Sequence, residues 1–453
     1  MILSSSTNTS TNIVVTKFGG TSLATAEQIK KVAAIIEADP NRRFTVASAP
    51  GKRFASDIKI TDLLYKCYNA ARDGEDFSGT LRDIQARFQD IIDGLGVKDF
   101  DLQSEIDTLD KNLRIFTKPD YAASRGEYIN SKIIAAFLKR EFVDAAELIF
   151  FSDDGLVDEE KTYGAIAARL GKLDKAVIPG FYGSLPNGEI KTFSRGGSDV
   201  TGSIIARGVG AIMYENWTDV SGMLSADPRI VNNPEVIQNI TYTELRELSY
   251  MGASVLHEDA VFPVRKARIP INIKNTNSPE DPGTKISASL PPNLRLERLK
   301  HSPVTGIAGK KGFTCIRVEK ALMNNQTGFG AKLLTIFADH NIPFEHCPTG
   351  IDSISVIVAS DLFDPEHQGV IFDINKTLVP DSVIIEDHLA LIAVVGEGMI
   401  RSKGIAAKIF ASLANSDINI RMIDQSSNEL NIIIGVDEAD YEKAVKFLYE
   451  AIF

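Results

Sequence analysis

Lys17 ends a β-branched run and is followed closely by Gly19 and Gly20, in the stretch IVVTKFGGTS. Glycines and hydroxyl residues after a strand favour a turn that binds phosphate through backbone N–H groups, because no Cβ blocks the approach. The lysine precedes the glycines, so the Walker order, in which lysine follows them, is absent. We therefore predict a phosphate-binding turn of another kind, with Lys17 supplying a full positive charge.

A second strand-like run ends in SRGGSD, which contains Arg195, Gly197, Ser198 and Asp199. A guanidinium beside paired glycines suits a carboxylate or a phosphate, which it can bind through two parallel hydrogen bonds. An ordinary strand-to-helix turn would explain the glycines equally well. In that case Asp199 would be only a carboxylate at a helix N-terminus.

A third run, YENWTDVSGMLSADPR, ends with Thr218 and Asp219 and carries Arg229 after a turn. The carboxyl ends of parallel strands meet at one edge of an α/β sheet, where ligands bind. Three strand ends with glycine, hydroxyl and charged residues therefore predict one shared site.

The elements that position these residues are indicated by apolar runs alternating with helical patterns between residues 13 and 275. This alternation predicts a mostly parallel sheet covered on both faces. Thr25 and Gln28 form a plausible capping box for the first helix. The predicted buried strands lie at 13–18, 43–49, 146–152, 175–181, 211–216 and 269–276.

The segment 277–299 concentrates proline, serine and charge, and it is the predicted domain boundary. Beyond it, GFGAKLLTIFADHNI from Gly328 matches GIAAKIFASLANSDI from Gly404, with identities in register at an offset of 76 positions. Strand-like runs follow both copies. The repeat predicts a duplicated accessory domain after an α/β enzyme body.

Composition excludes several classes of protein. The chain of 453 residues has a net charge of −11 and no dense basic stretch, which argues against nucleic-acid binding. Its three cysteines form no metal-binding or disulfide pattern, and no apolar run is long enough for a membrane span. Residues 1–12 resemble a disordered tail rather than a signal peptide, so we expect a cytoplasmic protein.

The motifs KFGGTS, SRGEYINSKIIAAFL, SRGGSD and TDVSGMLSADPR together resemble those of aspartate kinases in the amino-acid-kinase superfamily. The repeat resembles the paired ACT domains of these enzymes. The resemblance implies a three-layer αβα sandwich of the carbamate-kinase-like type followed by two ferredoxin-like ACT domains. The implied ranges are 13–293 for the kinase domain, 304–385 for the first ACT domain and 386–453 for the second.

The implied reaction is phosphorylation of the β-carboxylate of L-aspartate by ATP, with Mg²⁺ carried by the nucleotide and no direct protein ligand to the metal. The resemblance assigns roles in catalysis to Lys17, Asp199, Gly19 and Gly20. It assigns substrate contacts to Ser22, Thr61, Glu127, Arg195 and Ser198, with Glu127 meeting the α-amino group. It assigns nucleotide contacts to Lys17, Gly20, Gly197, Thr218, Asp219 and Arg229.

Three positions depart from the family pattern. Leu224 stands where many members have an aromatic residue, and Ser254 and Glu258 replace a lysine that contacts ATP and a proline. Lys274 is a candidate substitute for the missing ammonium. These departures leave open a second interpretation, an amino-acid sensor whose kinase body has decayed.

The first ACT copy resembles the effector-binding copy of lysine-regulated members, with Met323, Gly328, Phe329 and Glu345 as effector contacts. In the second copy, Arg421 occupies the position that corresponds to Glu345, so the charge is reversed there. We therefore expect only the first copy to bind L-lysine. We expect a monofunctional enzyme that forms a homodimer or homotetramer through its ACT domains. A further alternative keeps the fold and changes the acceptor, to glutamate or an N-acetylated analogue. Co-regulation by threonine is left open.

Overall fold

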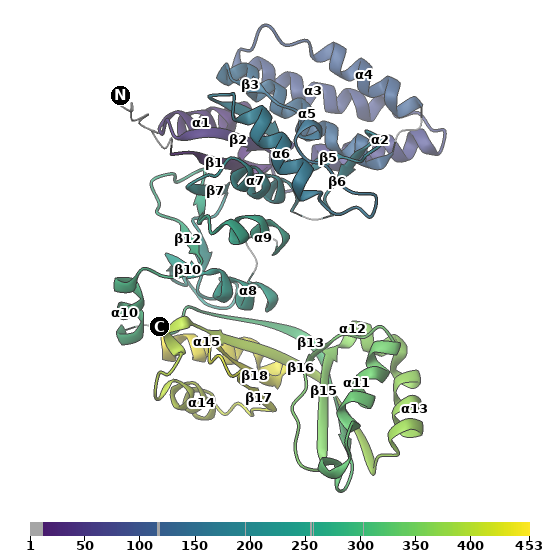
Figure 1. Cartoon of the computed structure of the whole chain (residues 1–453), viewed down its shortest axis with the longest axis vertical. Coiled ribbons are helices and arrows are strands. Elements are labelled where there is room, and N and C mark those ends of the chain that lie inside the picture. Colours follow the sequence, from purple (N-terminus) through teal and green to yellow (C-terminus); the bar gives the residue numbers. More distant parts are fainter. Residues whose placement is uncertain (1–11, 116–117, 195, 254–255, 257, 302) are drawn as a thin grey trace, which may run out of the picture. The chain divides into compact units, whose positions relative to one another are not determined.

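The computed structural model describes residues 12–115, 118–194, 196–253, 256, 258–301 and 303–453 (Figure 1). The chain divides into two compact units. The first unit contains residues up to 223 with 238–242 and 255–289, and the second contains 224–237, 243–254 and 290–453. Two internal segments of the range predicted for the kinase domain, and its last residues 290–293, therefore belong to the second unit.

The first unit is built on an eight-stranded sheet of order β10-β12-β11-β7-β1-β2-β4-β3. All neighbouring strands are parallel except β11 and β12, which are antiparallel. The strands are β1 (Val14–Phe18), β2 (Arg42–Ala47), β3 (Glu141–Phe142), β4 (Ala176–Pro179), β7 (Met213–Thr218), β10 (Asn239–Thr241), β11 (Ile271–Asn275) and β12 (Thr284–Ser287). A hairpin of β5 (Tyr182–Ser184) and β6 (Ile190–Thr192) is separate, and β8 (Met223–Leu224) pairs with β9 (Val236–Ile237).

Helices cover both faces of this sheet, which confirms the predicted three-layer sandwich. One layer shares a core with Phe18, Val177 and Trp217. It contains α1 (Ala26–Glu37), α2 (Ile60–Arg72), α3 (Ser78–Leu95), α4 (Leu102–Arg114) and α5 (Pro119–Leu138). On the other face, α7 (Gly197–Gly208) contacts β1, β2 and β7 and packs against α6 (Glu159–Leu170) and α9 (Glu258–Ala267).

Local sequence explains where these elements begin. The Thr25 side chain accepts a hydrogen bond from the Gln28 backbone at 3.3 Å, which confirms one half of the capping box predicted for α1. The return bond is absent among the described residues, because Gln28 Oε1 has no partner and Nε2 donates to Asn277 Oδ1 at 3.2 Å. The predicted strand at 146–152 is wrong. Asp144 accepts from Ala146 N at 3.0 Å and caps a 3₁₀ turn over Ala145–Glu147, which leaves Phe150 and Phe151 in isolated bridges. Leu148, Ile149 and Phe151 of that run are buried without forming a ladder.

The second unit contains a six-stranded antiparallel sheet of order β14-β15-β13-β16-β18-β17. The strands are β13 (Gly306–Glu319), β14 (Phe344–His346), β15 (Ser353–Ala359), β16 (Ser382–Val395), β17 (Met422–Asp424) and β18 (Asn431–Asp437). The helices are α8 (Tyr242–Tyr250), α10 (Pro292–His301), α11 (Phe329–Asp339), α12 (Ser360–Phe363), α13 (His367–Leu378), α14 (Ile405–Asn415) and α15 (Tyr441–Ile452).

Two hydrophobic cores lie along this sheet, and both use β13 and β16. One core joins Ile316 of β13 with α11 and α13, and Ile385 of β16 packs against it. The other joins Ile307 of β13 and Ile392 of β16 with α14 and α15. Figure 1 shows the two long strands running from the α14–α15 side to the α11–α13 side.

The internal repeat corresponds to α11 and α14. Each begins after a left-handed glycine, Gly328 with φ 84° and Gly404 with φ 92°. Leu333 and Ile409, which are also 76 positions apart, are both fully buried. The predicted duplication of a small α+β unit is therefore confirmed. Within the described ranges, no helix combines the length and apolarity that a membrane crossing needs.

Candidate active site

The carboxyl end of β1 carries Lys17, whose Nζ lies 2.6 Å from Oδ1 of Asp199 in the first turn of α7. Asn216, the register partner of Lys17 on β7, donates from Nδ2 to the same oxygen at 2.7 Å. The side chains of Lys17 and Asp199 are only 10% and 17% exposed. This pairing fixes a lysine ammonium at the edge of the sheet, beside the positive end of a helix.

The glycine turn is held from two sides. Gly19 N donates to Trp217 O at 3.1 Å, and Gly51 N, in the loop after β2, donates to Gly20 O at 2.8 Å. A Cβ added to Gly51 would lie 2.6 Å from the carbonyl carbon of Gly20. The close approach therefore requires glycine at position 51, which the sequence motifs did not single out.

We expect Gly51→Ala to push the glycine turn out of position. Overpacking of this kind costs about 1–3 kcal/mol of unfolding free energy, and the KM for ATP should rise with it. Denaturant unfolding can be followed through Trp217, the single tryptophan of the chain. Gly79→Ala is the matched control, because a Cβ there meets nothing within 4 Å. A Gly51→Ala enzyme as stable and active as this control would contradict the packing role.

The N-terminus of α7 forms the second part of the site. Its N-cap, Gly196, has a left-handed backbone with φ 55°, and Gly197 is buried. Ser198 is half-buried against Gly180, where an added Cβ would lie 2.6 Å from Ser198 Oγ. Arg195, the predicted carboxylate receptor, lies outside the described residues.

Glu127 is buried on α5 and stands out electrostatically. One side-chain oxygen, Oε2, has no hydrogen-bond partner among the described residues. Burial raises the pKa of Glu127 to about 8, against the lowering effects of the backbone N–H groups of Ala49 and Glu127 and of the Arg125 charge. A buried acceptor without a partner is costly, so this carboxylate is suited to receive a cationic ligand.

The remaining predicted substrate contacts differ in their surroundings. Ser22 is buried, and its Oγ lies 2.8 Å from Thr276 Oγ1. Thr61 is half-buried in the first turn of α2. The hydroxyl of Ser22 therefore already has a hydrogen-bond partner within the protein. Thr61 lies at the start of the helix that follows the loop beginning at Gly51.

The predicted nucleotide contacts do not all belong to one unit. Thr218 Oγ1 donates to Asp219 Oδ1 at 3.2 Å at the end of β7 in the first unit. Arg229 belongs to the second unit, where its guanidinium pairs with Asp227 at 2.6 Å and is 88% exposed. Ser254 lies outside the described residues. Lys274 lies over the Trp217 ring, 5.1 Å from its centroid, and burial lowers its pKa.

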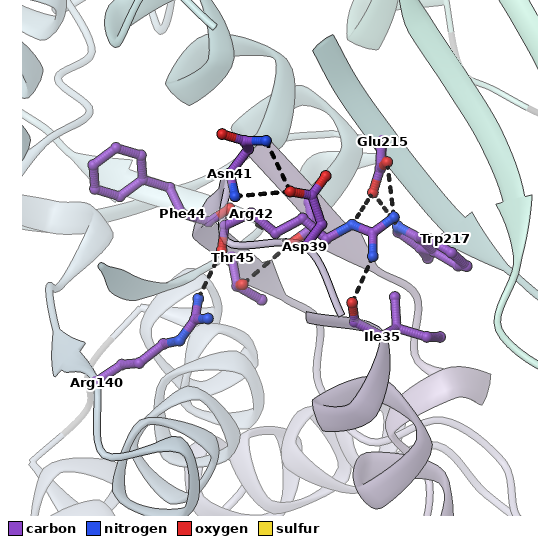
Figure 2. A network of polar contacts seen from close by, with 10 residues as sticks. Ile35, Asp39, Asn41, Arg42, Phe44, Thr45, Arg140, Glu215 and Trp217 are labelled. Atoms are coloured by element: carbon purple, nitrogen blue, oxygen red, sulfur yellow. Dashed lines mark hydrogen bonds and ion pairs between the residues drawn. The ribbon is translucent and has the colours of Figure 1, made fainter. Parts of the chain in front are cut away.

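A polar network missed by the sequence analysis joins β2 to β7 through Arg42, Glu215 and Trp217 (Figure 2). Arg42 of β2 binds Glu215 of β7 through Nε at 2.8 Å and Nη2 at 3.1 Å. Trp217 Nε1 donates to Glu215 Oε2 at 2.9 Å. The network thereby fixes Trp217, whose carbonyl oxygen accepts from Gly19. The one signal in the sequence that could have indicated this network is Glu215, an acidic residue inside a predicted buried strand.

In the second unit, the predicted effector residues lie on three elements of the first ACT copy: a 3₁₀ turn (Met323–Asn325), the start of α11, and β14. Met323 and Phe329 are buried around the turn at Gly328, and Glu345 is half-buried on β14. Tyr250 of α8 donates to Glu345 Oε2 at 2.5 Å. Burial and then this carboxylate raise the pKa of Tyr250 to about 12. Glu345 therefore has a hydroxyl partner that the sequence did not indicate.

No group of three or more His, Cys, Asp or Glu side chains in the described part of the chain is arranged to hold a metal ion. The assembled residues offer a paired ammonium, backbone donors and a buried carboxylate. They are suited to binding and orienting anionic groups beside a cationic one, and none of them forms a nucleophile–base pair.

Comparison with known proteins identifies the family. The amino acid kinase family model matches residues 12–275, and an ACT domain model matches 392–452. Aspartokinase 3 of Bacillus subtilis is 39% identical over 461 residues, covering 97% of this chain and 98% of that protein. The crystal structure of aspartate kinase from Clostridium acetobutylicum, described as an allosteric enzyme, has a TM-score of 0.88 at 51% identity, covering 98% of this chain and all of that one.

Escherichia coli aspartokinase III in complex with lysine and aspartate has a TM-score of 0.72 at 25% identity, covering 97% of this chain and 99% of that one. The matches to kinase and ACT sequences thus extend over nearly the whole length of both partners. The chain therefore belongs to the aspartokinase family, and it is an ATP-dependent aspartate kinase with C-terminal ACT domains.

Proposed function

We propose that this kinase transfers the terminal phosphoryl group of ATP, accompanied by Mg²⁺, to the β-carboxylate of L-aspartate. We further propose that L-lysine inhibits it through the first ACT copy. The observation that carries the catalytic part is the Lys17–Asp199 pair beside the Gly19–Gly20 turn. Its product, 4-phospho-L-aspartate, would open the pathway to the amino acids derived from aspartate.

The chemistry requires positioning and charge neutralisation. A β-carboxylate is ionised at neutral pH, so no general base is needed for attack on the phosphoryl group. Lys17 neutralises charge on the group in transfer, with Asp199 and Asn216 holding its ammonium in place. Backbone N–H groups of Gly20 and Gly197 donate to phosphate oxygens. Mg²⁺ bound to the nucleotide supplies further neutralisation.

The acceptor is recognised through its ammonium and its carboxylates. Glu127 receives the α-ammonium, and its unpartnered buried Oε2 supports this assignment. Arg195, Ser198, Ser22 and Thr61 remain predicted contacts to the rest of aspartate. Thr218, Asp219 and Arg229 remain predicted contacts to the nucleotide.

The raised pKa of Glu127 predicts a pH-dependent KM for aspartate. Below about pH 8 the free carboxyl group is neutral, and it must lose its proton before it can pair with an ammonium. The KM should therefore fall as pH rises towards 8, by up to about tenfold per pH unit. Initial rates at saturating ATP between about pH 6.5 and 8.5 measure this trend. Glu127→Gln should show a high KM with little slope, and a parallel slope in that variant would remove Glu127 as the titrating group.

Feedback by lysine is supported by the effector residues of the first ACT copy. An ammonium would find a carboxylate in Glu345, whose present partner is a neutral tyrosine hydroxyl. E. coli aspartokinase III has been crystallised with lysine and aspartate in a T-state, and with aspartate and ADP in an R-state. A two-state mechanism in this chain would require lysine to bind one state better than the other.

The deciding experiment is ADP release from MgATP and L-aspartate, with L-lysine or L-threonine as effector. Turnover suppressed by lysine supports both proposals, and turnover that responds only to threonine removes the lysine assignment. Glutamate and N-acetylated acceptors are run in parallel. Preference for an acylated amine would contradict the role of Glu127, since an amide N–H offers no positive charge. Absence of turnover with every acceptor would favour the alternative interpretation, an amino-acid sensor whose kinase body has decayed. A dimer or tetramer and a cytoplasmic location remain predictions.

A further inference from the structure

The loop of residues 51–59 joins β2 to α2 and is closed at its base by Arg87 of α3. The Arg87 guanidinium donates to Gly51 O at 2.7 Å and to Ile58 O at 2.5 Å, and it lies 3.5 Å from Asp57. Arg87 is only 7% exposed. Asp57 is also bound by Arg53 at 2.9 Å. Because one buried side chain bonds both ends, the base of the loop has a defined position.

This base lies against the phosphate-binding turn. Gly51 N donates to Gly20 O at 2.8 Å, and a Cβ on Gly51 would also approach Thr21 N to 2.8 Å. Two residues earlier, Ala49 packs against α5 beside Glu127, since a Cβ added to Gly126 would lie 2.8 Å from the Ala49 Cβ. The loop therefore begins between the residues assigned to phosphate and the residue assigned to the substrate ammonium.

Lys52 follows Gly51 directly. Its side chain is exposed, and among the described residues its ammonium has no carboxylate partner and a single long hydrogen bond, to Ala55 O at 3.4 Å. Adjacent Cα atoms are about 3.8 Å apart, and the four-carbon stem of lysine adds about 6 Å of reach. An anion bound at Gly20 is within that reach.

The charges at the site leave a bound phosphate chain in need of a further positive group, which the Lys52 ammonium can supply. The charge of Lys17 is already paired with Asp199 at 2.6 Å, and an arriving phosphate chain shares that ammonium with a carboxylate. Lys274 is the register neighbour of Trp217, whereas Lys17 is the neighbour of Asn216, so the two lysines point to opposite faces of the sheet. Lys52 lies on the loop that contacts the turn and has no acid to neutralise it.

We propose that Lys52 binds the terminal phosphates of the nucleotide, as a second ammonium beside Lys17. This assignment rests on the proposed location of those phosphates at the Gly19–Gly20 turn. Arg87 fixes the loop that presents Lys52, and the exposed position of Lys52 lets it bind as the nucleotide arrives.

The test compares Lys52→Met with Lys66→Met, which removes the same charge from an exposed position on α2. Binding of ADP and of adenosine is measured by calorimetry, with Trp217 fluorescence as a second readout. We expect Lys52→Met to weaken ADP binding about tenfold or more and to leave adenosine binding unchanged. The loss should shrink at high salt, and Lys52→Arg should restore most of the affinity.

Equal loss of ADP and adenosine binding would mean that the loop has moved, and would overturn the proposal. Unchanged ADP binding would overturn it as well, and so would an effect confined to the KM for aspartate, which would assign Lys52 to a substrate carboxylate. These titrations do not depend on turnover. A wild-type chain that binds ADP but phosphorylates no acceptor would therefore refute the proposed reaction while still deciding the role of Lys52.

Discussion

Lys17→Ala is expected to lower kcat by at least about a thousandfold, since loss of one uncharged transition-state donor already costs about a hundredfold to a thousandfold. The substitution also leaves the Asp199 carboxylate facing the phosphate chain without a counter-charge. Aspartate binding should be nearly unchanged, because Glu127 lies on a different element. Single-turnover phosphoryl transfer and aspartate binding, measured on the same preparation, separate the two effects.

Stability must be controlled in that experiment, because removing one partner of a buried ion pair costs about 3–5 kcal/mol. The double variant Lys17→Ala with Asp199→Asn removes the uncompensated charge and should recover much of the unfolding free energy. It should not recover turnover. Lys30→Ala, on the exposed side of α1, controls for the change in net charge. Near-normal turnover in Lys17→Ala would refute the assigned role.

Glu345→Ala is expected to raise the lysine concentration for half-inhibition by about tenfold to a hundredfold, the value of one hydrogen bond to a charged group. The rate without lysine should change little, because Glu345 lies in the second unit on β14. Inhibition curves at fixed, subsaturating aspartate measure the shift. Glu450→Ala removes the same charge from the exposed end of α15 and serves as the control.

Tyr250→Phe provides an opposite test of the same site. The phenolic hydroxyl now occupies Glu345 Oε2, and lysine must displace it to reach that oxygen. Removing the hydroxyl should therefore lower the half-inhibitory lysine concentration. If neither Glu345→Ala nor Tyr250→Phe moves the curve, the effector binds elsewhere.

The sequence predicted those features that depend on local chemistry and chain order. Lys17 stands at the end of β1, and Asp199 stands in the first turn of α7, which follows β6. The rule that parallel strands bring their carboxyl ends to one edge predicted one shared site. However, β6 belongs to the β5–β6 hairpin and not to the eight-stranded sheet, so the rule does not explain why the two side chains meet. The repeat was visible in the sequence, because Gly328 and Gly404 must both adopt a left-handed backbone before their helices begin.

Other features depend on contacts that no local pattern encodes. Gly51 looks like any loop glycine until its distance from Gly20 is known. The hydrogen bond between Tyr250 and Glu345 joins two residues 95 positions apart that no sequence pattern connects. The run at 146–152 has the composition of a buried strand, but the N-cap at Asp144 starts a 3₁₀ turn there, and burial without a ladder has the same hydrophobic pattern.

The strands β13 and β16 belong to both ACT cores, and a division at residue 386 would fall inside β16. With this division, neither ACT copy would contain all the strands that form its core. A fragment cut at that point would leave two incomplete sheets, each with an apolar face open to aggregation. Replacing one copy with that of another protein would also replace strand residues of its neighbour, since β13 and β16 supply side chains to both cores.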